Sequence, residues 1–151
     1  MNETRTIWPV SALVLATVGF AIAAVGLYFI FLRPPLLPED IRYMHLSSAQ
    51  LGVVRLPLEA WLNQVFRVLG GYILATGVLT MTVAATSFRA RNRGAALGAT
   101  LGGAASIGLM ATVNFIIDSN FKWVLLVIAF AWGCSLVLFW FETRARRGGQ
   151  T

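Results

Sequence analysis

The sequence predicts an all-α fold: a polytopic membrane protein built as a bundle of four transmembrane helices. Of its 151 residues, 58% are hydrophobic and 12% are charged, whereas roughly 25% of an ordinary soluble domain is charged. The apolar residues also form four long blocks, each near the ~20 residues that a helix needs to cross a bilayer. A soluble domain of this length could not bury so much apolar surface. The lipid bilayer is therefore the first partner that the sequence predicts.

A single membrane domain over residues 1–151 is expected. The predicted transmembrane helices cover residues 8–32, 63–88, 94–117 and 121–142. The segments between and after them are a connector over 33–62, a basic turn over 89–93 and a tail over 143–151.

The first apolar block is predicted to be an uncleaved anchor, although a cleaved signal peptide is the alternative for a block near an N-terminus. The block runs from Trp8 to Leu32. It is longer than the roughly 7–15 apolar residues of a signal sequence, and no small-residue cleavage site precedes a polar segment.

The connector is predicted to be ordered, partly helical and placed at the membrane surface. Three prolines within residues 34–38 end the first helix. Acidic residues 39–40 are typical of the first turn of a short helix. Ser47 and Gln50 form the pattern of a capping box for another short helix. Pro57 is predicted to open the second long helix, which should project beyond the bilayer at its start.

Basic residues predict the orientation of the helices. They gather in the turn and in the tail, as Arg89, Arg91, Arg93, Arg144, Arg146 and Arg147. With four spans these segments fall on one side, which the positive-inside rule places in the cytoplasm. We therefore expect a bacterial inner-membrane protein with both termini cytoplasmic and the connector facing outward. Topology explains the net charge of +6, so anionic lipid headgroups are expected partners at the turn and tail, and nucleic acid is not.

Polar residues at matching depth form the candidate binding site. Glu59, Asn63 and Arg67 lie four residues apart on one helix face, and Asn114 and Asp118 are also four apart. Counted from the basic turn, Arg67 and Asn114 both lie roughly 32–33 Å along their helices. We expect Arg67 to meet Asn114 or Asp118 near the outer interface. A structural pair that joins the two helices is the favoured interpretation, and a ligand or ion site is the alternative.

Further binding candidates lie in the connector. They are Glu39, Asp40, Arg42 and His45. Recognisable catalytic motifs are absent from the sequence, so no catalytic residue is assigned. One cysteine, Cys134, and one histidine, His45, exclude a thiolate cluster or a bis-histidine haem within one chain. No metal or cofactor is expected.

Small residues at four-residue spacing predict close helix packing by the third helix. This stripe consists of Gly94, Gly98, Gly102 and Ser106. Glycines on the first two helices offer partner surfaces, namely Gly19, Gly26, Gly70, Gly71 and Gly77. Packing inside one bundle is favoured over a homo-oligomer.

Two stretches carry a resemblance to a group of proteins. The run from Leu32 to Met44 reads LRPPLLPEDIRYM, and the run from Phe66 to Gly71 reads FRVLGG. In these the chain resembles small bacterial four-helix inner-membrane proteins over most of its length. The resemblance implies that fold and no particular activity.

Three functions remain open, and we rank them. The first is a non-enzymatic accessory or self-associating membrane subunit, which has a membrane-protein partner or forms a homo-oligomer. The second is a small transporter or a ligand- or lipid-binding bundle that uses the polar cluster near the outer interface. The third is an enzyme that modifies a lipid or quinone, with Asp118, Glu39, Asp40 or His45 as acid or base. It ranks last because the sequence does not show these groups converging on a substrate.

Overall fold

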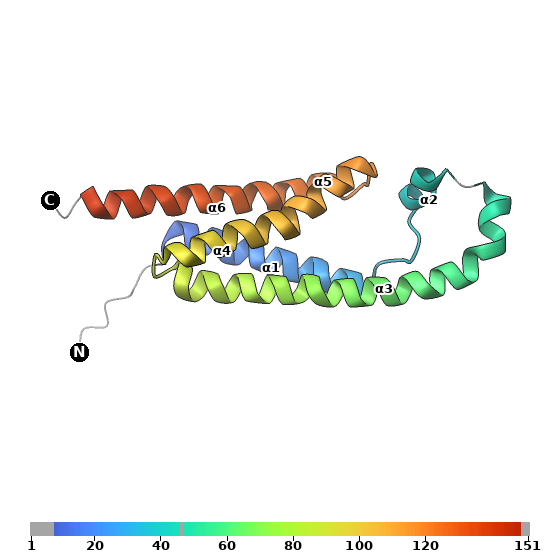
Figure 1. The fold of residues 1–151 in the computed structure, drawn as a ribbon, viewed down its shortest axis with the longest axis horizontal. Helices are drawn as coiled ribbons and strands as arrows, with labels where there is room; N and C mark the ends of the chain where they lie inside the picture. The colour runs from blue at the N-terminus through green and yellow to red at the C-terminus, as the bar shows by residue number, and fades with distance from the viewer. Residues whose placement is uncertain (1–7, 46, 149–151) are drawn as a thin grey trace.

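The computed structural model describes residues 8–45 and 47–148, and this part of the chain is helical without strands (Figure 1). Its elements are α1 (Val10–Phe31), α2 (Pro38–Met44), α3 (Ser48–Val83), η1 (Ala84–Phe88), α4 (Arg93–Gly103), η2 (Ala104–Gly108), α5 (Leu109–Ile116) and α6 (Lys122–Gly148). The π-helical segments η1 and η2 continue their neighbours without a break. The chain therefore forms four long rods and the short helix α2.

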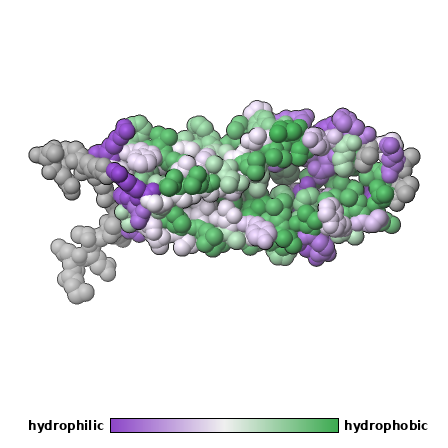
Figure 2. All heavy atoms as spheres, in the orientation of Figure 1, coloured by the Kyte–Doolittle hydropathy of each residue, from purple (hydrophilic) through white to green (hydrophobic). Residues whose placement is uncertain are grey.

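All four rods are long and apolar enough to cross a membrane, as predicted. The segments that meet both conditions are Val10–Phe31, Val54–Phe88, Arg93–Ile116 and Lys122–Ala145. Hydrophobic residues cover the middle of the molecule, and hydrophilic residues gather toward its two ends (Figure 2). Large apolar side chains such as Phe20 and Phe130 are exposed at 68% and 73%, a pattern typical of helices that face lipid.

The two ends of the bundle differ in composition. One end, here called the basic end, holds the start of α1, the turn between η1 and α4 with its arginines, and the end of α6 (Figure 1). The other, here called the connector end, holds α2, the start of α3 and the turn between α5 and α6. Arg146, Arg147 and residues 149–151 belong to the predicted basic tail, and their side chains lie outside what the structure describes.

Helix α1 packs closely along α3 through glycines on both helices. A Cβ added to Gly26 would lie 2.4 Å from the backbone nitrogen of Leu74, and one added to Gly77 would lie 2.4 Å from that of Ala23. Two further glycines have equally little room for a Cβ, namely Gly19 and Gly70. Because no side chain separates the backbones, the helices gain van der Waals contact along their length.

Within one described chain, no neighbouring helix packs closely against the central members of the small-residue stripe on the third helix. A Cβ added to Gly98 or Gly102 would meet nothing within 4 Å. These residues line a groove of about 590 Å³ between α4, α3 and α1. The glycines of α1 and α3 face each other, so those helices leave the stripe on α4 uncovered within the described chain. Another glycine makes the close contact of this helix, because a Cβ on Gly103 would lie 2.0 Å from the Trp132 indole nitrogen.

The start of α3 corrects one expectation. Ser47 caps a helix as predicted: its hydroxyl accepts from the Gln50 backbone N–H at 3.3 Å, and the Gln50 side chain accepts from the Ser47 N–H at 3.0 Å. That helix is not short, because it continues through Pro57, which lies inside α3 instead of opening it. The first turns of α3 curve away from the rest of the rod (Figure 1), as expected where proline removes a helical hydrogen bond. Helix α3 therefore includes residues 48–62 of the predicted connector, and its segment that is long and apolar enough to cross a membrane runs from Val54 to Phe88.

The last helix also extends beyond its predicted end. We expected it to end at residue 142, and α6 continues to Gly148. Alanine and arginine favour the helical state, so the charged end of the chain can add turns beyond the apolar stretch.

Candidate functional site

A cavity of about 840 Å³ lies in the connector half of the bundle, between α1, α3, α5 and the start of α6. This volume falls within the range of small-molecule sites, roughly 300–1,000 Å³. The cavity exists because α3 packs along α1 and α5 packs along α6, whereas α3 and α5 make little direct contact. Its walls are mainly aliphatic and aromatic, with Ile22 on α1, Ile73 on α3, Met110 on α5 and Leu125 on α6 among them.

The cavity reaches the outer surface of the bundle between α3 and α5. Side chains that line it are also exposed: Tyr72 at 71% and Leu69 on α3, and Leu109 at 58% and Val113 on α5. A molecule could therefore enter from the side, between two apolar helix faces.

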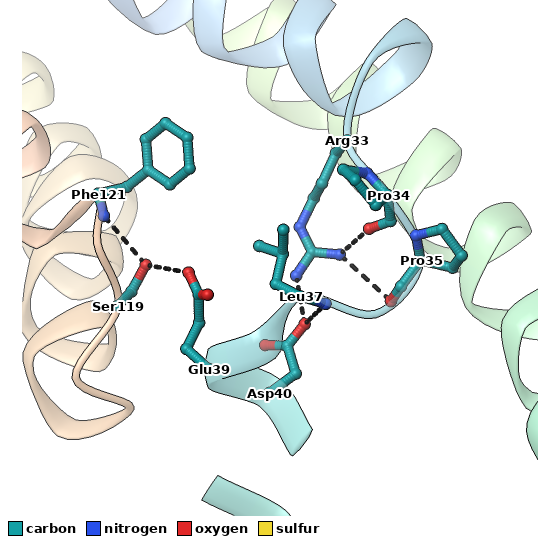
Figure 3. A network of polar contacts seen from close by, with 8 residues as sticks. All are labelled: Arg33, Pro34, Pro35, Leu37, Glu39, Asp40, Ser119 and Phe121. Carbon is teal, nitrogen blue, oxygen red and sulfur yellow. Dashed lines mark hydrogen bonds and ion pairs between the residues drawn. The ribbon is translucent and has the colours of Figure 1, made fainter. Parts of the chain in front are cut away.

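Four polar residues line the cavity toward the connector end, and they are here called the roof: Arg33, Glu39, Asp40 and Ser119 (Figure 3). The Arg33 guanidinium donates to the Asp40 carboxylate at 3.1 Å and to the Pro34 carbonyl at 2.9 Å. The same guanidinium lies over the ring of Phe66, 3.5 Å from its centroid, and 5.3 Å from that of Phe29. These contacts join the segment after α1 to the first turn of α2. The cation–π interaction with Phe66 joins the same segment to α3.

Local sequence explains why α2 forms within this roof. Pro38 occupies its first turn, where the missing N–H costs nothing. The Asp40 carboxylate accepts from the Leu37 backbone N–H at 3.0 Å, which reinforces the start of the helix. His45 ends α2 in a left-handed conformation, with φ 53°. Helix α2 is therefore a short helix with two acidic residues, Glu39 and Asp40, in its first turn.

Glu39 reaches toward Ser119, whereas Asp40 reaches toward Arg33 (Figure 3). Its carboxylate accepts from the Ser119 hydroxyl at 3.3 Å, and Ser119 in turn accepts from the Phe121 backbone N–H at 3.2 Å. Glu39 is 3% exposed and lines the cavity. This contact joins α2 to the turn between α5 and α6, so the roof spans the bundle from α1 to α6.

The structure does not bring the predicted polar cluster together. Glu59 pairs with Arg55 at 2.8 Å, one turn earlier on α3, and Asn63 and Arg67 are exposed on the same helix. Within the described chain Arg67 forms no ion pair with Asp118. The expectation assumed that α3 and α5 are packed neighbours at this depth, and the cavity separates them instead.

The carboxylate of Asp118 is paired with a residue near it in the sequence, at the turn between α5 and α6. It forms an ion pair with Lys122, one turn later. Hydrogen bonding from Lys122 lowers the pKa of Asp118, and the positive charges of Lys122 and Arg42 act in the same direction. Arg42 also donates to the Asp118 backbone carbonyl at 3.3 Å, so α2 contacts this turn at a second point.

Asn114 is the one member of that cluster that lines the cavity. Its amide donates to the Met110 carbonyl one turn earlier at 2.9 Å. A polar group in an otherwise apolar wall gives a ligand a place to form a hydrogen bond.

Sequence reasoning missed Arg33 and Ser119 as members of the site. A signal existed for Arg33, because a proline-rich turn before Asp40 brings two opposite charges back toward each other. The partnership of Glu39 with Ser119 spans 80 residues, and no local pattern indicates it.

Comparison with protein families, with curated proteins and with solved structures finds no match to this chain. Within the described residues, no group of three or more His, Cys, Asp or Glu side chains is placed to hold a metal ion.

Proposed function

We propose that this protein is a membrane-embedded binding protein for an amphipathic molecule. The observation that carries the proposal is the cavity between α3 and α5, which combines an apolar interior, an opening on the side of the bundle and a polar roof. The apolar part of the ligand occupies the interior, and its headgroup lies under the roof. This is the lipid-binding alternative among the three functions. It keeps Glu39, Asp40 and Asn114 from the predicted candidates and adds Arg33 and Ser119.

The shape of the cavity favours an amphiphile over a small polar solute. Its lining is mostly Leu, Ile, Val, Met and aromatic side chains, and its charged side chains, Arg33, Glu39 and Asp40, all belong to the roof. A polar solute would lose its hydration in such an interior without gaining hydrogen bonds. An alkyl or isoprenoid chain that moves there from lipid loses no hydration, because neither environment hydrates it. The contacts of the headgroup therefore decide which molecule binds.

We also propose that the four rods cross a bacterial inner membrane, with the basic end in the cytoplasm and the roof outward. The arginines of the turn between η1 and α4 support this orientation, because positive charge is retained on the cytoplasmic side. The roof then lies at the level of the outer headgroups, where an amphiphile from the outer leaflet can enter sideways. Anionic lipid headgroups bind the arginines at the opposite end.

Native mass spectrometry of the protein, extracted gently from its own membrane, tests the binding proposal. We expect a bound amphiphile at defined stoichiometry. Ala21→Phe fills the cavity, because Ala21 lines it, and should abolish this adduct. Ala75→Phe is the matched control, since Ala75 is exposed on α3 and lines neither the cavity nor the groove. Equal adducts in both variants would contradict binding in the cavity.

A second candidate function is an accessory or self-associating subunit. The observation that favours it is the open stripe on α4, where Gly98 and Gly102 face a groove and meet no side chain. Small residues are common where transmembrane helices associate, and a second copy of this chain could place a helix there. The same mass spectra test this: a dimer that Gly98→Leu disrupts supports self-association, and a monomer with bound amphiphile contradicts it.

A further inference from the structure

The Glu39 carboxylate is the least compensated charge of the cavity. It is 3% exposed, and its one hydrogen-bond donor in the described chain is the neutral hydroxyl of Ser119. A buried carboxylate without a cation is costly, because a hydroxyl does not replace the hydration that the charge has lost.

Three cations lie on the elements around Glu39, and each one is engaged elsewhere. Arg33, after α1, pairs with Asp40. Arg42, on α2 itself, donates to the backbone carbonyl of Asp118. Lys122, at the start of α6, pairs with the Asp118 carboxylate. No ion pair in the described residues includes Glu39, and its side chain lines the cavity, so its carboxylate is placed to accept from a cationic ligand there.

We propose that the cavity selects amphiphiles with an ammonium headgroup and that Glu39 binds this group. The inference rests on the proposed function and names its ligand class. An ammonium supplies both the missing positive charge and the missing donors, and such charge-assisted hydrogen bonds are about twice as strong as neutral ones. A hydroxyl headgroup supplies a donor without the charge, and a carboxylate headgroup is repelled.

Three probes share one alkyl chain and differ only in the headgroup, so they separate its contribution to affinity from that of the apolar part: tetradecylammonium, tetradecanol and tetradecanoate. Their dissociation constants are measured by native mass spectrometry at neutral pH, with the full-length protein in a non-ionic detergent. We expect the ammonium probe to bind at least about tenfold more tightly than the alcohol. The carboxylate should bind most weakly. This ranking in the wild type tests the proposal without any substitution.

Glu39→Gln removes the charge and keeps an oxygen that can accept from Ser119. In this variant the ammonium and alcohol probes should bind equally well. Glu59→Gln is the matched control, because Glu59 lies at the same end and outside the cavity, and it should keep the wild-type ranking. Thermal unfolding of both variants shows whether the fold survives.

The possible outcomes separate the two proposals. If Ala21→Phe does not weaken binding of any probe, the proposed function is wrong. If Ala21→Phe weakens all three but the wild type shows no preference for ammonium, the cavity binds amphiphiles and the inference about Glu39 is wrong. A preference for ammonium that persists in Glu39→Gln also overturns it.

Discussion

At the basic end, the guanidinium of Arg91 pairs with the carboxylate of Glu142. The Ser11 hydroxyl joins this pair: it accepts from Arg91 at 3.0 Å and donates to Glu142 at 2.6 Å. Glu142 also lies 3.4 Å from the Ser11 backbone N–H, in the first turn of α1. One carboxylate therefore links α6, the turn before α4 and the start of α1, where the helix dipole favours negative charge.

Arg91→Ala should lower stability, and Arg93→Ala should not. The Arg91 side chain is 11% exposed and that of Glu142 is 26% exposed, whereas Arg93 is exposed in the same turn. Loss of one partner from a buried pair costs roughly 3–5 kcal/mol, and partial exposure of Glu142 reduces this to about 2–3 kcal/mol. Thermal unfolding in detergent measures the difference, and equal melting temperatures for the two variants would contradict the account.

Gly77→Ala should destabilise the bundle, and Gly71→Ala on the same helix should not. A Cβ at Gly77 would collide with the α1 backbone, whereas one at Gly71 would meet nothing within 4 Å. Overpacking costs about 1–3 kcal/mol, while alanine at an open helical position gains up to about 1 kcal/mol over glycine. Unfolding of both proteins side by side checks the sign, and a stabilised Gly77→Ala would contradict the close contact of α1 and α3.

Asp118 should give a small acid-dependent contribution to stability. Its pKa in the folded protein lies below the ordinary value of 3.8, chiefly because Lys122 donates a hydrogen bond to it. The contribution is therefore present above this ordinary value and is lost as the pH falls through the lower, folded value. Its side chain is 66% exposed, so the effect is modest. Melting temperatures of wild type and Asp118→Asn should differ at pH 6 and converge in acid. A gap that widens in acid would be the opposite of this expectation.

Labelling of introduced cysteines tests the proposed orientation. In a Cys134→Ser background, Tyr43→Cys and Ala90→Cys place exposed thiols at opposite ends of the bundle. We expect an impermeant maleimide added to intact spheroplasts to label position 43 and to spare position 90 until the membrane is broken. The reverse pattern would place the roof in the cytoplasm and would remove the outer leaflet as the source of the ligand.

The sequence predicts the helical rods of this fold better than it predicts which rods pack against each other. Apolar blocks bounded by prolines and arginines indicate where helices begin and end, and the capping pattern at Ser47 indicates a real helix start. Spacing along a helix also gives depth, which is why Arg67 and Asn114 were placed at the same level. It does not show which neighbouring helix a given helix packs against, and α3 packs against α1 instead of α5.

The candidate site could be predicted only in part for the same reason. Acidic residues after Pro38 predict α2, and thus Glu39 and Asp40 in one turn. Which of the two pairs with Arg33 and which faces Ser119 depends on how α2 lies across the bundle. The glycine stripes on α1, α3 and α4 look alike in the sequence, and only the packed helices show that the stripe on α4 is open.

Photo-crosslinking with a diazirine-bearing alkylammonium tests the central claim most directly, because peptide mapping shows where the bound chain lies. We expect cross-links to Ile73 on α3 and Met110 on α5, which both line the cavity, and we expect Ala21→Phe to suppress both. Cross-links confined to exposed positions such as Val127 and Phe130 on α6, unchanged in that variant, would show that the probe contacts the protein only from the surrounding lipid and would contradict a ligand-binding cavity.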